Sequence, residues 1–236
     1  MIAKMDIESI LFLDIETVPQ RSNFSELEIL DQDLYAAKTK YLRRDDHTPE
    51  EFYERAGIWA EFGKIVCISL GYFVNREGKE FRTRSFYGDE QELLVEFSKV
   101  LNEHFSKDNH VLCAHNGKEF DFPYIARRLL ILGLPLPDKL NLFGKKPWEV
   151  PHLDTLELWK FGDYKHFTSL KLLTRVLNIP SPKDDIDGSE VSRVFYEEND
   201  IERIVRYCEK DVIAVAQIIL RLRNEPLLKK EQIVHT

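Results

Sequence analysis

Three apolar segments in the first ninety residues have the spacing of β-strands. The run at 10–15 is continuously apolar up to Asp14, which is typical of a buried strand. The segments at 64–74 and 80–87 alternate apolar and polar residues, and a turn is predicted between them at 76–79. Strands that follow one another in this way predict an antiparallel meander at the start of an α/β domain.

From residue 89 onward the apolar spacing is mostly helical. Asp89-Glu90-Gln91-Glu92 resembles a capping box, and apolar residues then recur every three or four positions. A strand is predicted at 110–114, and the helix before it favours a parallel pairing. The remaining predicted elements are helices at about 122–132, 169–177 and 189–196, a short fifth strand at 150–153, a turn-rich link at 180–183, and a long helix from Asn199-Asp200-Ile201-Glu202 to about Arg223.

These elements predict one α/β domain with a mixed sheet of about five strands, an antiparallel meander followed by parallel strands, flanked by helices. The domain spans 1–236, because no Pro/Gly/Ser-rich linker divides the chain. The charged segment at about 22–62 is helical in pattern and is interpreted as an insertion between the first two strands. A short tail follows residue 224.

Composition narrows the class of protein further. Hydrophobic residues make up 43% and charged residues 31%, as in an ordinary globular protein. No apolar run approaches the roughly 18 residues of a membrane span, and the N-terminus lacks the apolar core of a signal peptide. The three cysteines, Cys67, Cys113 and Cys208, have neither zinc-site nor disulfide spacing. We therefore expect a cytoplasmic protein with buried thiols and no membrane partner.

The charge is unevenly distributed along the chain. The formal net charge is -8, which argues against a general nucleic-acid coat protein. Residues 115–183 nevertheless carry 11 Lys/Arg and 7 Asp/Glu, a local charge of +4, whereas the remainder carries -12. An acidic protein with such a segment can hold a short nucleic-acid end at a locally basic cleft. The alternative is that these charges only solvate the surface.

Carboxylates at three separated places are the candidate chemistry. Asp14 and Glu16 lie two residues apart on a strand, so their side chains project from the same face. Asp121 follows a strand at the start of a helix, where it could instead cap that helix. Gathered carboxylates repel one another and usually need a cation. Each signal alone is weak, because Asp14 and Glu16 also fit a polar strand end.

The fourth carboxylate, Asp211, lies on the long helix. Tyr207 precedes it by four residues, so both side chains lie on one helical face. A tyrosine there is commonly part of a core, but an inward carboxylate needs a partner. Glu209 and Lys210, on other faces, are interpreted as solvated.

In this order the residues resemble a known family, the DEDD 3′–5′ exonucleases of the ribonuclease H-like fold, in the tyrosine subclass. The Phe-Asp-x-Pro-Tyr piece most resembles the proofreading exonuclease of family B DNA polymerases, and the likeness runs from about residue 8 to 222. The matching pieces are Asp14-Ile15-Glu16-Thr17, Asn116-Gly117-x-x-Phe120-Asp121-x-Pro123-Tyr124 and Tyr207-x-x-x-Asp211.

The resemblance implies a role for each residue. Asp14 would bridge two Mg²⁺ or Mn²⁺ ions, Glu16 and Asp211 would complete the first site, and Asp121 would act partly through bound water. Tyr207 would orient the attacking water. Thr17, Asn116 and Phe120 would contact the terminal nucleotide, although Asn116-Gly117 also fits a plain turn and Phe120 also fits the core.

Several other polar residues compete for a place in the site. Asp154 ends a predicted strand, but Asp154-x-x-Glu157 is better interpreted as a helix cap. Asp187 is interpreted as a turn residue and His115 as a packed or solvated loop residue. Basic side chains that could contact phosphates, without a specific prediction for any of them, are Arg127, Arg128, Lys171 and Arg175.

The implied reaction is the release of nucleoside 5′-monophosphates from the 3′ end of single-stranded DNA, with two metal ions. One alternative is an RNA 3′–5′ exonuclease of the same fold, because discrimination between the sugars depends on contacts to the 2′ position. A second alternative is a non-catalytic nucleic-acid-binding module that keeps the fold. Such a module would usually lack one of the carboxylates, and all four are present.

Overall fold

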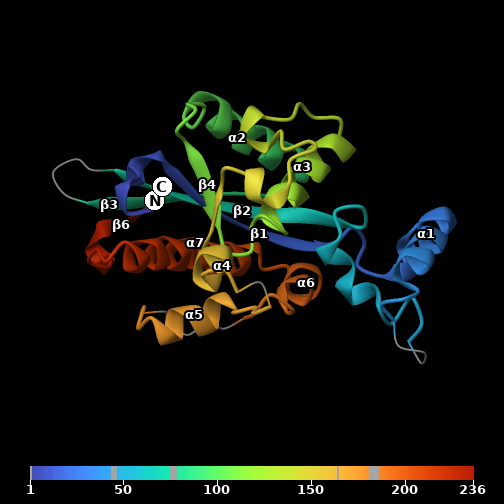
Figure 1. The fold of residues 1–236 in the computed structure, drawn as a ribbon. Coiled ribbons are helices and arrows are strands. Elements are labelled where there is room, and N and C mark those ends of the chain that lie inside the picture. Colours follow the sequence, from blue (N-terminus) through green and yellow to red (C-terminus); the bar gives the residue numbers. More distant parts are fainter. Residues whose placement is uncertain (1, 44–46, 75–78, 164, 181–185) are drawn as a thin grey trace.

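The computed structural model describes residues 2–43, 47–74, 79–163, 165–180 and 186–236, which form a mixed α/β fold around one twisted sheet (Figure 1). The predicted turn at 76–79 and the link at 180–183 lie largely outside the described residues. The described part contains six strands in the order β5-β4-β1-β2-β3-β6. Their bounds are β1 Ile10–Pro19, β2 Gly63–Val74, β3 Glu80–Tyr87, β4 Val111–Ala114, β5 Leu153–Asp154 and β6 Ile233–His235.

The pairing confirms the predicted sheet. Strands β1, β2 and β3 are antiparallel neighbours, and β4 runs parallel to β1. The predicted fifth strand is displaced: β5 begins at Leu153 rather than at Val150 and pairs in parallel with β4. Pro151 lacks a backbone N–H and cannot donate to a ladder, so pairing starts after it. The sixth strand, β6, lies in the tail, for which no strand was predicted, and runs parallel to β3.

Helices cover both faces of the sheet. In Figure 1, α7 runs along one side, and α2 and α3 lie on the other. The α-helices are α1 Ile29–Thr39, α2 Glu90–Glu103, α3 Asp121–Ile131, α4 Thr155–Lys160, α5 Leu170–Val176, α6 Val191–Arg193 and α7 Ile201–Leu222. A π-helical stretch at Val194–Glu198 continues α6, so the predicted helix at 189–196 lies two residues later, at 191–198, and is less regular than expected.

The alternation of β1 decides which residues meet which helices. Leu11, Leu13 and Ile15 belong to the core cluster that includes residues of α2 and α3. Ile10 and Phe12 belong to a second cluster with residues of α7. Because side chains of a strand alternate between faces, Asp14 and Glu16 project with Ile10 and Phe12 toward α7.

The first turn of α7 is fixed by a cap. The Asp200 carboxylate accepts a hydrogen bond from the Arg203 N–H at 3.0 Å, so Asp200 rather than Asn199 is the capping residue. The helix packs closely on β2. A Cβ built on Gly71 would lie 2.3 Å from Cζ of Phe81 on β3 and 2.9 Å from Cγ1 of Val212 on α7, distances that real side chains do not show. Glycine at this position therefore allows α7 to approach the sheet.

The segment between β1 and β2 contains α1 and two short 3₁₀ turns, Phe24–Glu26 and Tyr53–Ile58. A small cluster of buried residues, Tyr35 and Tyr53 among them, packs this segment together. In Figure 1, α1 lies at the opposite end of the molecule from both termini.

Two findings concern the cysteines and the predicted absence of a membrane span. All three cysteines lie in the described part of the chain and are buried free thiols, as predicted. None of the helices in the described ranges combines the length and the apolar character that crossing a bilayer requires.

Candidate active site

The acidic pair of β1 lies where that strand is irregular. The antiparallel register of β1 with β2 shifts between Glu16 and Thr17, which marks a β-bulge directly after the pair. Bulges re-aim side chains and are common beside functional sites. Glu16 is buried, with 7% of its surface exposed, whereas Asp14 is partly exposed.

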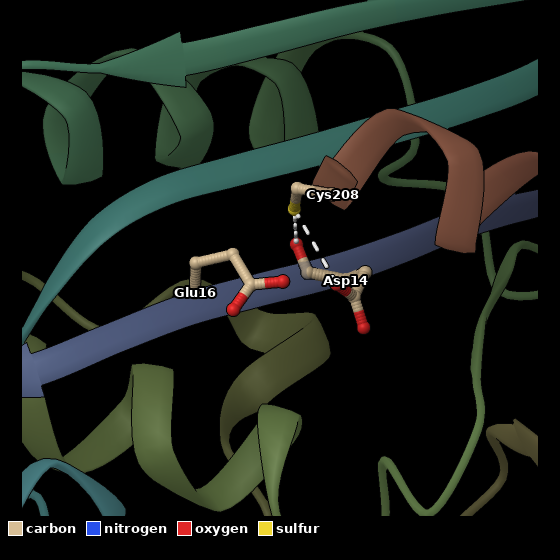
Figure 2. Close-up of side chains that lie close together, drawn as sticks. All are labelled: Asp14, Glu16 and Cys208. Carbon is tan, nitrogen blue, oxygen red and sulfur yellow. Dashed lines mark hydrogen bonds between the residues drawn. The ribbon is translucent and has the colours of Figure 1, made fainter. Parts of the chain in front are cut away.

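Helix α7 brings a third group to this pair. The Cys208 thiol lies 3.4 Å from both the backbone oxygen and the carboxylate Oδ2 of Asp14, and donates to them (Figure 2). Ligand atoms of Asp14, Glu16 and Cys208 all lie within 4.8 Å of one another. The role of Cys208 was not predicted, because on sequence it is one more apolar position of the helix.

Asp121 reaches the site from the start of α3. It is the first residue of that helix and is 3% exposed. Backbone hydrogen bonds within the preceding loop set its position, including Phe122 N–H to the Gly117 carbonyl at 2.9 Å. Gly117 fits there because a Cβ would lie 2.4 Å from that of Ala114.

Burial and the charges of neighbouring carboxylates raise the pKa values of Asp14 and Glu16. Burial raises the pKa of Asp14 well above its ordinary value, and the charges of Glu16, Asp121 and Asp211 raise it further. Burial and the charge of Asp211 likewise raise the pKa of Glu16. The four predicted carboxylates therefore lie near enough to repel one another, and together they form the Asp14 cluster, in which Glu16 and Asp121 are buried and Asp14 and Asp211 are partly exposed.

The pKa of Asp121 is raised for the same reasons. Burial raises its pKa to about 7, and the charges of Asp154 and Asp211 contribute. Hydrogen bonds from the backbone amides of Asp121 and Ile15 oppose the rise. A counter-charge in the cluster would return these groups to their ionised form.

Tyr207 borders the cluster. Its side chain is partly buried and packs beside the apolar residues that α6 and α7 bury against β1 and β2. Burial raises the pKa of the phenol, followed by the charges of Asp211, Glu16 and Asp14. The hydroxyl therefore keeps its proton at neutral pH and remains a hydrogen-bond donor.

The donor atoms fit a hard divalent cation. Four carboxylates offer oxygen ligands, which Mg²⁺ and Mn²⁺ prefer. The raised pKa values of Asp14, Glu16 and Asp121 show a site that a cation would stabilise. The neighbouring Cys208 thiol is occupied as a donor to Asp14, so it does not make the site a soft one.

The three residues predicted to contact a nucleotide flank the predicted carboxylates along the chain: Thr17 follows Glu16, and Asn116 and Phe120 precede Asp121. Asn116 has a left-handed backbone, with φ of 62°, and is partly buried in the loop before α3. Phe120 packs against Tyr124, with ring centroids 5.3 Å apart, and borders the core. Thr17 follows the bulge.

Other candidates have structural roles. Arg128 is 3% exposed and pairs with Glu90, so it is not available to a phosphate. Asp187 accepts hydrogen bonds from the amide and hydroxyl of Ser189, as expected for a turn. The interpretation of Glu209 as solvated is wrong. Its carboxylate contacts Ser85 and His235 at 2.9 Å each, partners from β3 and β6 that local sequence does not reveal.

The predicted helix cap at Asp154 is confirmed. Its carboxylate accepts from the backbone amides of Leu156 at 2.9 Å and Glu157 at 3.4 Å, at the start of α4. His115 is packed rather than solvated, since its ring contacts the Thr155 hydroxyl and the Thr168 carbonyl at 2.9 Å each.

This mixed sheet, with acidic residues brought to one centre by β1, α3 and α7, defines a ribonuclease H-like domain. A family model described as RNase_H superfamily matches residues 53–223, and the chain belongs to that family. The matched range includes Asp121, Tyr207 and Asp211 but begins after Asp14 and Glu16.

Relatives narrow the likeness to DNA polymerases. The chain is 25% identical to DNA polymerase 1 of Pyrococcus abyssi over 222 residues, 81% of the chain and 28% of the polymerase. It is 27% identical to a DNA polymerase of Pyrococcus glycovorans over 172 residues, 64% of the chain and 21% of the polymerase. The match thus spans about a quarter of each polymerase.

A solved structure has the same fold. The family B DNA polymerase of Pyrobaculum calidifontis superposes with a TM-score of 0.53 and 19% identity, over 91% of this chain and 24% of that one. The predicted ribonuclease H-like fold and the resemblance to family B DNA polymerases are therefore both confirmed.

Proposed function

We propose that this chain is a metal-dependent 3′–5′ exonuclease that releases nucleoside 5′-monophosphates from single-stranded DNA. One observation carries the proposal: the charge of Asp211 acts on Asp14, Glu16 and Asp121, whose pKa values are all raised, and on Tyr207 beside them. The proposed unit is a single domain over 1–236, with residues 22–62 as an insertion and the residues after 224 as a tail.

The four carboxylates would hold two Mg²⁺ or Mn²⁺ ions. When bound, such ions activate water and stabilise the leaving oxygen in phosphodiester hydrolysis. The likeness to polymerases named as acting on DNA supports DNA rather than RNA as the substrate.

The remaining residues would align the reacting groups. The protonated Tyr207 hydroxyl can orient a water molecule by donating or accepting a hydrogen bond. Asn116 and Thr17 offer polar groups to the terminal nucleotide, and the partly exposed ring of Phe120 offers it an apolar surface. Base recognition of this kind depends little on sequence.

The test uses one DNA strand labelled at either its 5′ or its 3′ end, incubated with and without Mg²⁺ and separated on a gel. A 5′-labelled strand should shorten one nucleotide at a time, and a 3′-labelled strand should release its label as a mononucleotide at once. Chelation of the metal should stop both. Asp14→Asn protein, prepared in parallel, controls for contaminating nucleases.

Other outcomes reject defined parts of the proposal. Cleavage inside the strand, or from the 5′ end, overturns the exonuclease direction. Faster digestion of an RNA of the same sequence overturns DNA as the substrate. Binding of the strand without any digestion, in Mg²⁺ and in Mn²⁺, identifies a non-catalytic binding module.

A further inference from the structure

The Asp154 carboxylate joins two segments of the chain. Besides capping α4, it accepts hydrogen bonds from the backbone amides of Asn116 at 2.9 Å and Lys118 at 3.1 Å. The residue is 2% exposed. A buried carboxylate needs such partners, and here half of them belong to the loop between β4 and α3, residues 115–120.

That loop carries part of the candidate active site. Asn116 lies within it, and Asp121 follows it directly. The left-handed backbone of Asn116 turns the chain, and its carbonyl accepts from the Phe120 amide at 3.0 Å. Asp154 therefore holds the first part of the 115–120 loop, and the last residue of that loop leads directly into Asp121.

Two weaker contacts join the same segments. His115 meets the Thr155 hydroxyl at 2.9 Å, and Lys118 forms an ion pair with Glu157 at 2.8 Å. The Glu157 side chain is 41% exposed, so this pair is partly screened by solvent. Asp154 is the buried and charged member of the connection.

We propose that Asp154 is a positioning residue for the nuclease site, which fixes the 115–120 loop so that Asn116 and Asp121 face the Asp14 cluster. It acts on the loop through the Asn116 and Lys118 amides, and its charge also acts on Asp121. The inference rests on the proposed function for its kinetic consequence, whereas its structural part stands on the hydrogen bonds alone.

The variants are graded by how many acceptors they remove. Asp154→Asn retains one acceptor oxygen, which can serve Asn116 and Leu156, and loses the acceptor for Lys118. Asp154→Ala removes both. Partners that orient a metal ligand typically contribute about 10- to 100-fold in affinity or activity. We expect kcat and Mn²⁺ affinity each to fall about tenfold or more in Asp154→Ala and less in Asp154→Asn, with a smaller change in KM.

Asp89→Ala is the matched control. Asp89 caps α2 in the same way, accepting from the amides of Gln91 at 3.0 Å and Glu92 at 3.1 Å, but it contacts no residue of the 115–120 loop in those hydrogen bonds. It should lower the melting temperature and leave kcat and Mn²⁺ affinity within about twofold of wild type, because a helix cap contributes about 1 kcal/mol to stability alone.

Three quantities are measured: the rate of strand digestion, the affinity for Mn²⁺ as monitored by electron paramagnetic resonance, and the rate of hydrogen exchange at the Asn116 and Lys118 amides. Faster exchange at both amides with the loss of Mn²⁺ affinity supports the inference. If Asp154→Ala and Asp154→Asn keep the kcat and Mn²⁺ affinity of Asp89→Ala, Asp154 is only a cap. A wild type that digests nothing rejects the proposed function, while Mn²⁺ binding and exchange still decide the role of Asp154.

Discussion

Charged side chains are buried at two places in the described part of the molecule, and the two places differ in whether a residue of opposite charge lies beside them. On the α2 and α3 side, Glu90 and Arg128 form an ion pair at 2.6 Å, with side chains 12% and 4% exposed. The guanidinium also donates to the Ala60 carbonyl at 2.8 Å, and Glu90 accepts from the Ile65 amide at 2.7 Å. Each charge in this pair has its counter-charge within the chain.

On the α7 side, the Asp14 cluster gathers charges of one sign. The charges that raise the pKa of Asp14 come from Glu16, Asp121 and Asp211, and the opposing contribution is a neutral thiol, Cys208. Isolated buried charge costs several kcal/mol or more. The fold thus compensates the buried Glu90 carboxylate from within the chain, whereas the Asp14 cluster would, under the proposed function, be compensated by a cation from solution.

The largest effect should come from removing the central carboxylate. Asp14→Asn should lower the rate of strand digestion about a thousandfold or more, equivalent to about 4 kcal/mol, because the carboxylate proposed to hold both metal ions would be lost. Gel assays give the rate, and circular dichroism verifies the fold. Full activity in this variant would show that the cluster is not the site of the reaction.

Removing one partner of the Glu90–Arg128 ion pair should lower the stability of the fold rather than the rate of strand digestion. Arg128→Met leaves Glu90 buried without its partner, which should lower the free energy of unfolding by about 3–5 kcal/mol. The double variant Glu90→Leu/Arg128→Met should recover much of the loss. Urea denaturation measures both. If the single variant is as stable as wild type, the pair is not what compensates Glu90.

The pH dependence of the stability of the metal-free protein should report on the carboxylates of the Asp14 cluster. The pKa of Asp121 is raised from 3.8 to about 7, so between these values the folded chain holds a proton that the unfolded chain has lost. Stability of the metal-free protein should therefore fall as pH rises from about 4 to 7, and the raised pKa values of Asp14 and Glu16 act in the same direction.

Saturating Mg²⁺ should reverse this trend, raising the melting temperature at pH 8 by on the order of 5 °C and much less at pH 5. Thermal scans in chelator and in Mg²⁺ test it, with Asp121→Asn as the control that makes the metal-free curve less steep between about pH 4 and 7. A metal-free protein that gains stability over pH 4–7 would contradict the raised pKa.

The smallest effect should come from Tyr207→Phe, which removes a hydroxyl but no charge. We expect kcat to fall about tenfold with little change in KM, since orientation of the attacking water contributes to the reaction step rather than to binding. Steady-state digestion at several strand concentrations separates the two. An unchanged kcat would assign Tyr207 to the core alone.

Local pattern was sufficient where an element's own residues determine it. The alternation at 64–74 and 80–87 predicted β2 and β3, and the spacing after residue 201 predicted α7. Spacing placed Asp14 with Glu16 and Tyr207 with Asp211 on common faces, whereas their selection as site residues together with Asp121 came from the family resemblance and stays a prediction.

Features that depend on distant partners were not predicted. Strand β6 is three residues long and is held by β3, more than 140 positions earlier in the chain. Glu209 is part of this edge through His235 and Ser85. Asp154 was recognised as a cap, but its bonds to Asn116 and Lys118 depend on how β5 pairs with β4.

The contact between Asp14 and Cys208 spans 194 residues of sequence. During synthesis on the ribosome, β1 is therefore complete long before α7 is made. A nascent chain that still lacks α7 has Asp14, Glu16 and Asp121 but neither Tyr207 nor Asp211. The cluster can assemble only when translation has passed α7, so under the proposed function an unfinished copy that lacks α7 would not cut nucleic acid near the ribosome.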